Sequence, residues 1–161
     1  MTLDALAAAL AVDLERIVGL FRSLSPPSGL SMTAAATLAS IERLGPQRLT
    51  LLAAREGVTQ PAMTQLITRL EDAGLARREH DPADGRVVLV AVTDQGRATL
   101  AGRRAVRSER LGAILAELSG EHRAALAAAL PALDALAGIP RRDDPARIAA
   151  HGATALGTIA H

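Results

Sequence analysis

The first 24 residues carry a regular apolar seam. Apolar side chains recur every seven positions from Leu3 to Leu24, and a second apolar set lies between them. This spacing is typical of a helix packed along its length on another helix. Two interpretations stay open: an amphipathic core helix, and a seam between two copies of the chain. The proline-containing segment 25–29 predicts a break after it.

The next stretch predicts two short helices. Ser31 or Thr33 is placed to cap the first, which is expected to end near Leu44, before a Gly-Pro pair. Thr50 is placed to cap the second, over residues 51–56, and Gly57 closes it.

A further helix is predicted to begin at Thr59, whose hydroxyl can accept backbone N–H bonds. Pro61 lies in its first turn, where a missing N–H has no consequence. Apolar residues spaced by three and four positions indicate one buried face, and Gly74 ends the helix. Two short helices joined by a tight turn predict a helix-turn-helix.

The periodicity changes after this helix. Residues 75–79 and 86–92 are short strand-like runs, and the second is rich in valine. Between them, residues 80–85 read HDPADG, which is turn chemistry. A hairpin directly after a helix-turn-helix predicts a winged helix-turn-helix.

Two long helices are predicted in the remainder, capped by Thr93 and Ser119. The first is expected to bury Leu100 and later aliphatic residues, and to leave four arginines on an outer face that is solvated or lies between domains. These are Arg103, Arg104, Arg107 and Arg110. The alternative is that these arginines contact phosphates from the start of the helix. Pro131 lies within the leucine pattern of the second helix and is expected to kink or split it.

Composition narrows the function classes. The 161 residues are 49% hydrophobic and 22% charged, which indicates one folded domain. The absence of cysteine excludes disulfides, a thiolate zinc site, a cysteine nucleophile and a cysteine redox switch. Phe21 is the only aromatic residue, which counts against a base-stacking platform for single-stranded nucleic acid. No signal peptide and no apolar run of ~20 residues is seen, so a soluble, cytoplasmic protein is expected.

Catalysis and metal binding are not expected. The four histidines are too scattered for metal-ligand spacing, and the common nucleotide-binding, hydrolase and zinc-protease motifs are absent. The chain is therefore expected to have no cofactor and no enzymatic activity.

Positive charge is concentrated in the middle of the chain. The net charge is +1, but residues 43–110 hold 12 arginines against 8 acidic residues. A basic region is the usual electrostatic footprint of a nucleic-acid-binding protein. The predicted second helix of the pair adds Gln, Thr and Ala side chains, which can read adenine and the thymine methyl group. Arg69, Arg77 and Arg86 supply charge nearby for phosphates or the minor groove.

In this region the sequence resembles the MarR (multiple antibiotic resistance regulator) family of bacterial transcription regulators. The resemblance rests on QPAMTQLITRLEDAGL for the recognition helix, RREHDPADGR for the wing and VTDQG at the start of the next helix. It implies a mainly α fold with a small β-hairpin wing, in one domain over 1–138. Residues 31–92 would form the winged helix-turn-helix lobe, residues 1–24 and 93–138 the dimerisation helices, and 139–161 a tail without assigned role.

The resemblance also implies which residues contact DNA. From the recognition helix and the wing these are Thr59, Gln60, Pro61, Ala62, Thr64, Gln65, Arg69 and Arg86. Arg78 and Asp84 match a family pair that braces the wing. Gly85 stands where many members carry an additional arginine, which predicts a weaker or different grip by the wing.

A regulator of this kind would be a homodimeric repressor on a palindromic double-stranded operator, released by a small aromatic, lipophilic or anionic effector. The effector crevice would lie between the dimer helices and the DNA-binding lobe. Its candidate lining residues are Phe21, Leu24, Met32 and Ala35, with Arg16 or Arg22 nearby. The alternative hypothesis is a helical dimer whose winged domain binds another protein without specific DNA binding.

Overall fold

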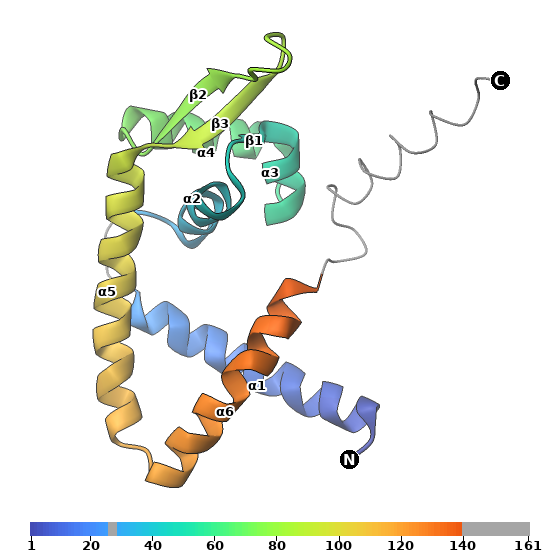
Figure 1. The fold of residues 1–161 in the computed structure, drawn as a ribbon, viewed down its shortest axis with the longest axis vertical. Helices are drawn as coiled ribbons and strands as arrows, with labels where there is room; N and C mark the ends of the chain where they lie inside the picture. The colour runs from blue at the N-terminus through green and yellow to red at the C-terminus, as the bar shows by residue number, and fades with distance from the viewer. Residues whose placement is uncertain (26–28, 140–161) are drawn as a thin grey trace, which may run out of the picture.

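The computed structural model describes residues 1–25 and 29–139, so the predicted tail lies almost entirely outside the described residues. Figure 1 shows an upper lobe and a lower stem, joined by one long helix. In chain order the elements are α1 (Leu3–Leu24), α2 (Met32–Leu44), β1 (Gln47–Arg48), α3 (Leu49–Glu56), α4 (Gln60–Asp72), β2 (Ala76–His80), β3 (Val88–Val92), α5 (Asp94–Ala116) and α6 (Gly120–Gly138). The mainly helical fold with a small β wing is as predicted. The lobe consists of α2, α3, α4 and the three strands, and the stem consists of α1, α5 and α6.

Side-chain caps set the start of most helices. Thr2, Ser31, Thr59, Thr93 and Ser119 each place a hydroxyl oxygen on a free backbone N–H of the first turn that follows. The last three were predicted from the sequence, and the first of the two candidates for α2 is the residue that acts as the cap. The chain therefore enters the recognition helix α4 in a defined direction.

The start of α3 differs from the prediction. The helix begins at Leu49, and its N-cap residue Arg48 makes no side-chain capping bond, so Thr50 lies inside the helix rather than before it. The reason is the strand β1, in which Arg48 pairs with Leu89 of β3. Strand pairing holds Arg48 extended, and the helix follows immediately. The antiparallel sheet has the order β1-β3-β2.

Helix α6 is not split at Pro131. It runs from Gly120 to Gly138 with this proline inside it. A proline removes one backbone hydrogen bond of the helix. The neighbouring alanines and leucines are among the strongest helix formers, which offsets that loss.

The hydrophobic core lies in the lobe. Its least exposed side chains come from α2, α3, α4 and β3, namely Leu38, Ile41, Leu52, Met63, Ile67 and Val90. The stem is different, because α6 buries no residue and α1 buries only Leu24 among the described residues. Large apolar side chains of both helices are exposed, including Ile17 at 54% and Leu130 at 63%. In Figure 1 these two helices extend away from α5 on the same side.

The faces of α5 were assigned only partly correctly. Leu100 is buried as expected, but Leu111 is exposed and the later aliphatic residues are half-buried. Arg103, expected on the outer face, is only 6% exposed. This arginine is buried because the side of α5 that carries it packs toward α2.

The beginning of α5 is bonded to the end of the recognition helix. The Thr93 hydroxyl donates to the carbonyl of Gly74 at 2.6 Å, and the Thr93 N–H donates to the carbonyl of Leu75 at 3.1 Å. Gln95 Nε2 donates to the Ala73 carbonyl at 3.3 Å. We call these contacts the α4–α5 junction. The junction ties the start of α5 to the end of α4.

Candidate nucleic-acid interface

The recognition helix α4 has one buried face and one exposed face. Its apolar residues Met63, Leu66, Ile67 and Leu70 are buried against the lobe. Every residue for which a DNA contact was predicted on this helix is exposed: Thr59, Gln60, Pro61, Ala62, Thr64, Gln65 and Arg69. The structure therefore brings these predicted residues to one accessible face.

The threonines of this face are ordered by the helix itself. The Thr64 hydroxyl donates to the Gln60 carbonyl at 2.9 Å, and the Thr68 hydroxyl donates to the Thr64 carbonyl at 3.1 Å. The hydroxyl protons are thus used within the helix. Each threonine keeps a methyl group and an acceptor oxygen for an outside partner, which suits contact with a thymine methyl or a base amino group.

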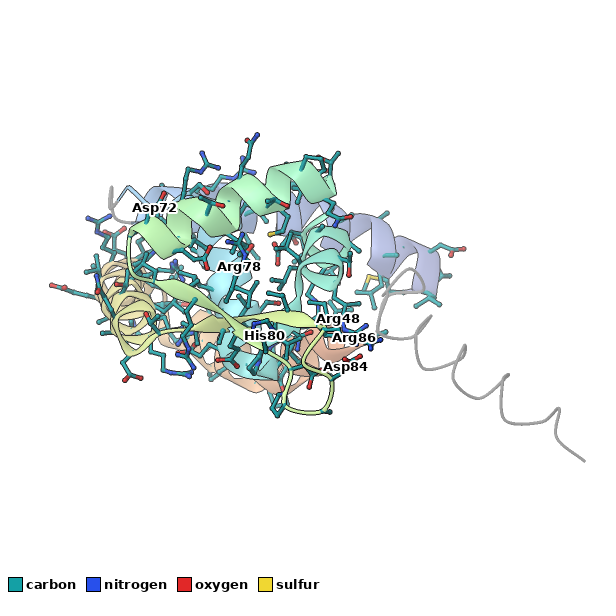
Figure 2. The ribbon with its side chains drawn as sticks, turned by 90° about the horizontal axis from the view of Figure 1, so that it is seen from above. Arg48, Asp72, Arg78, His80, Asp84 and Arg86 are labelled. Atoms are coloured by element: carbon teal, nitrogen blue, oxygen red, sulfur yellow. The ribbon has the colours of Figure 1, made fainter. Side chains whose placement is uncertain are left out.

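Two aspartates shape the tip of the wing. Asp81 Oδ1 accepts from the Ala83 N–H at 2.9 Å, and Asp84 Oδ1 accepts from the Arg86 N–H at 3.1 Å. The Asp84 carbonyl accepts from the Val87 N–H at 2.9 Å. These turns hold the backbone of Arg86, whose side chain is exposed at the wing. Figure 2 shows Asp84 and Arg86 together at this end of the hairpin.

The predicted bracing pair of Arg78 and Asp84 is not formed. Arg78 instead makes an ion pair with Glu71 of α4, while Asp84 binds the Arg86 backbone. The strand register explains the difference, because Arg78 lies opposite Val90 within the sheet and Asp84 lies beyond its end. Figure 2 shows the two residues apart, Arg78 toward α4 and Asp84 in the turn. Arg78 therefore braces the recognition helix against the wing.

Charge around the interface also differs from the prediction. Arg77 Nη2 lies 2.8 Å from Glu79 Oε2, so part of its hydrogen-bonding capacity is used within β2. An exposed arginine that the sequence did not single out, Arg48, lies on β1 opposite Leu89, on the wing sheet that also leads to Arg86. A strand of two residues leaves no alternating pattern, so nothing in the sequence could have placed Arg48 beside the wing.

A cavity of about 160 Å³ lies between α1, α2 and α5. Three predicted lining residues, Phe21, Met32 and Ala35, line it, whereas Leu24 is buried and is not part of the lining. The charged lining residues are not Arg16 or Arg22. They come from α5 and are Arg103, Arg104 and Arg107. The sequence indicated an outer, solvated or interdomain face for these arginines and did not connect them with the effector crevice.

The charged side chains that line the cavity are all arginines, and one of them, Arg104, is paired with Glu42 outside the lining. The Arg107 guanidinium carbon lies 3.9 Å from the centroid of the Phe21 ring, and its Nε is buried with no hydrogen-bond partner among the described residues. Burial, and then the charges of Arg103 and Arg104, lower the pKa of Arg107. The lining residues include no carboxylate. An anion in this cavity would reduce the repulsion among the three guanidinium groups.

Residues 1–25 and 29–139 contain no group of three or more histidine, cysteine, aspartate or glutamate side chains arranged to hold a metal ion. Within the same part of the chain, no helix is both long and apolar enough to cross a membrane.

Comparisons with known proteins agree with this architecture. Residues 30–88 match the model of the MarR family. A helix-turn-helix-type transcriptional regulator of Mycobacterium bovis is 34% identical over 131 residues, which are 81% of this chain and 92% of the relative. A helix-turn-helix-type transcriptional repressor of Bacillus subtilis, MdtR, is 33% identical over 50% of this chain and 54% of the relative.

The structural comparison covers lobe and stem together. A crystal structure of a transcriptional regulator from Pseudomonas aeruginosa superposes with a TM-score of 0.72 and 31% identity, over 85% of this chain and 96% of the other. One assignment follows from the helix-turn-helix, its wing and these relatives. The chain belongs to the MarR family of winged helix-turn-helix proteins, and it is a DNA-binding transcriptional regulator rather than an enzyme.

Proposed function

We propose that this regulator is a homodimeric repressor that binds a palindromic operator and is released by a small anionic ligand. The observation that carries the DNA-binding part is the exposed polar face of α4 beside the Arg86 wing. The lobe, residues 31–92, reads the DNA, and the helices within 1–24 and 93–138 hold two lobes together.

The case for the dimer rests on uncovered apolar surface. Within one chain, α1 and α6 expose long rows of leucine, isoleucine and valine side chains. Soluble proteins rarely leave contiguous apolar surface of this kind uncovered. A second copy, packed by two-fold symmetry, covers both helices with the same surface and presents two recognition helices to the DNA. Two-fold symmetry in the protein requires a palindromic operator.

The proposed DNA contacts divide by groove. Thr59, Gln60, Pro61, Ala62, Thr64, Gln65 and Arg69 lie on or before α4 and enter the major groove, which admits one helix. Arg86 reaches the minor groove from the wing, where a narrow A·T-rich groove attracts a guanidinium. Arg48, on the same sheet, contacts the neighbouring phosphates.

The repressor and ligand parts have separate support. A relative from Bacillus subtilis is a transcriptional repressor. The cavity between α1, α2 and α5 joins three guanidinium groups to an apolar wall, which suits a small anion with an aromatic or lipophilic body. A ligand there lies between stem and lobe and can change their relative position.

Separate substitutions of Arg86 and Gln65 distinguish the contribution of charge to DNA affinity from the contribution of base recognition. Because a dimer carries each change twice, Arg86→Ala is expected to weaken binding to all sequences and to reduce the slope of log affinity against log salt by about 2. Gln65→Ala is expected to cost about 1–3 kcal/mol in each half-site and to relax preference at one base pair, without changing the slope. Fluorescence anisotropy with a selected palindrome and a scrambled duplex, over a range of salt concentrations, measures both effects.

The control is Arg16→Ala, which removes a charge from a stem side chain that is 82% exposed. It should leave affinity, slope and base preference as in the parent. If Arg86→Ala and Gln65→Ala both bound the palindrome as tightly as the parent, the assignment of these DNA contacts would be wrong. If the affinity for the palindrome did not exceed the affinity for random DNA by a factor of ~10³, the alternative of a winged domain that binds another protein would be favoured.

A further inference from the structure

We propose that the ion pair between Glu42 and Arg104 is a latch between lobe and stem, and that an anion bound in the cavity opens it by drawing Arg104 away. The inference rests on the proposed function, because it assigns the regulation of the same cavity. It adds two residues, Glu42 in the lobe and Arg104 in the stem. Their ion pair determines whether ligand binding changes the position of the recognition helix.

The latch joins two elements far apart in the chain. Arg104 Nη2 on α5 lies 2.6 Å from Glu42 Oε2 near the end of α2. Helix α2 is fixed in the lobe, because Leu38 and Ile41 are almost fully buried in the core. The ion pair therefore ties the stem helix to the body of the lobe.

The α4–α5 junction is a second attachment on the same helix. Thr93, at the junction, and Arg104 are separated by 11 positions, which corresponds to roughly 16 Å along a helix. Two attachments at this separation set the angle between α5 and the lobe. Between them, Leu100 of α5 is buried in the lobe core. With the latch open, the part of α5 beyond Leu100 is freed to turn, and the two recognition helices of a dimer lose their set spacing.

Arg104 belongs to the latch and to the cavity at once. Its side chain lines the cavity with Arg103 and Arg107, whereas Glu42 is not among the lining residues. Apolar contact between α5 and the lobe core is made by Leu100, one helical turn before Arg104. The ion pair lies beyond it on α5, beside the cavity that Ala35, Ala36 and Ala39 line from α2.

An anion in the cavity competes directly with Glu42. Glu42 is held by Nη2 of Arg104, and an N–H that turns toward an anion in the cavity is no longer available to Glu42. The ligand carboxylate and the Glu42 carboxylate also repel each other when both approach Arg104. Opening of the latch is therefore coupled to occupancy of the cavity by negative charge, and a neutral ligand of the same shape does not produce it.

Thermodynamic linkage gives the direction in which removing the ion pair changes the affinity for an anion. If anion binding opens the latch, removing the latch favours anion binding. Exposed ion pairs contribute about 0.2–1 kcal/mol, so Glu42→Gln is expected to tighten binding of an anionic probe by up to about fivefold. The same change should weaken binding to the operator without ligand, and should reduce the factor by which the anion weakens DNA binding.

Benzoate is a suitable probe and benzamide its neutral counterpart. A cavity of about 160 Å³ is close in size to cavities of roughly 150 Å³ that hold benzene. With methyl-¹³C methionine, the signal of Met32, on the lining, reports binding. Met63, fully buried in the lobe core, serves as the internal reference. Operator affinity is measured on the same samples with and without benzoate.

Glu109→Gln is the matched control, because it removes the same charge from an exposed position of α5 outside the cavity lining. We expect benzoate to shift the Met32 signal, benzamide to bind at least tenfold more weakly, and Glu42→Gln alone to change benzoate affinity and its effect on DNA. Equal benzoate affinity and equal weakening of DNA binding in parent and Glu42→Gln would overturn the latch while leaving the ligand cavity intact. If benzoate does not bind the parent, both the cavity and the latch are overturned.

Discussion

Ile17→Asp is expected to convert the protein to a monomer and to lower operator affinity at least a hundredfold. Ile17 is 54% exposed in the single chain and lies on the seven-residue seam of α1, so the change leaves the lobe core untouched. In a two-fold interface it removes one apolar side chain from each copy, about 1.5–3 kcal/mol apiece. It also places two carboxylates in an apolar surface.

Loss of the dimer acts on DNA through avidity. Two linked reading heads bind 10²–10⁴ times more tightly than one without any new contact. Sedimentation equilibrium at micromolar concentration and anisotropy with the palindrome measure the two quantities, and circular dichroism checks the fold. Arg16→Asp is the control, because it puts the same carboxylate on the neighbouring residue, off the seam. A dimeric Ile17→Asp variant with parental affinity would contradict the proposed interface.

Gly96→Ala is expected to destabilise the protein by about 1–3 kcal/mol, although alanine is normally the better helix former. A Cβ at this position would collide with the carbonyl oxygen of Leu75 and would lie 2.8 Å from Val92 Cγ2. Backbone at the α4–α5 junction must then move. Thermal unfolding should show a midpoint lower by several degrees.

A control substitution on the same helix is expected to change stability in the opposite direction. Gly102→Ala adds a Cβ that meets nothing within 4 Å, so it should raise stability by up to about 1 kcal/mol through helix propensity. Because the junction also orients α4, Gly96→Ala should weaken operator binding beyond its effect on folding, measured at a temperature where the variant is fully folded. Equal effects of the two substitutions would show that the junction is not close-packed.

Local signals in the sequence predicted the elements well. The limits of α1, Leu3–Leu24, follow from its apolar seam and from the break after it. The caps at Thr59, Thr93 and Ser119 were readable because a single side chain and its own helix determine them. The exposed face of α4 followed from the spacing of its four buried residues.

What the sequence could not show depends on contacts between distant segments. Strand β1 exists only because β3 lies beside it, and it shifts the start of α3. Arg78 was expected to pair with Asp84, but the hairpin register turns it toward Glu71. The burial of Arg103 and the arginine-lined cavity require knowing which side of α5 faces α2, and the sequence pattern of α5 alone does not give that side.

Selection of bound duplexes from a random pool, at physiological salt, tests the central claim most directly. We expect enrichment of an inverted repeat whose half-site centres lie about 10 base pairs apart, with one recognition helix bound to each half. Recovery of a single asymmetric site, or of no preferred sequence at all, would contradict a symmetric dimer that reads DNA through α4.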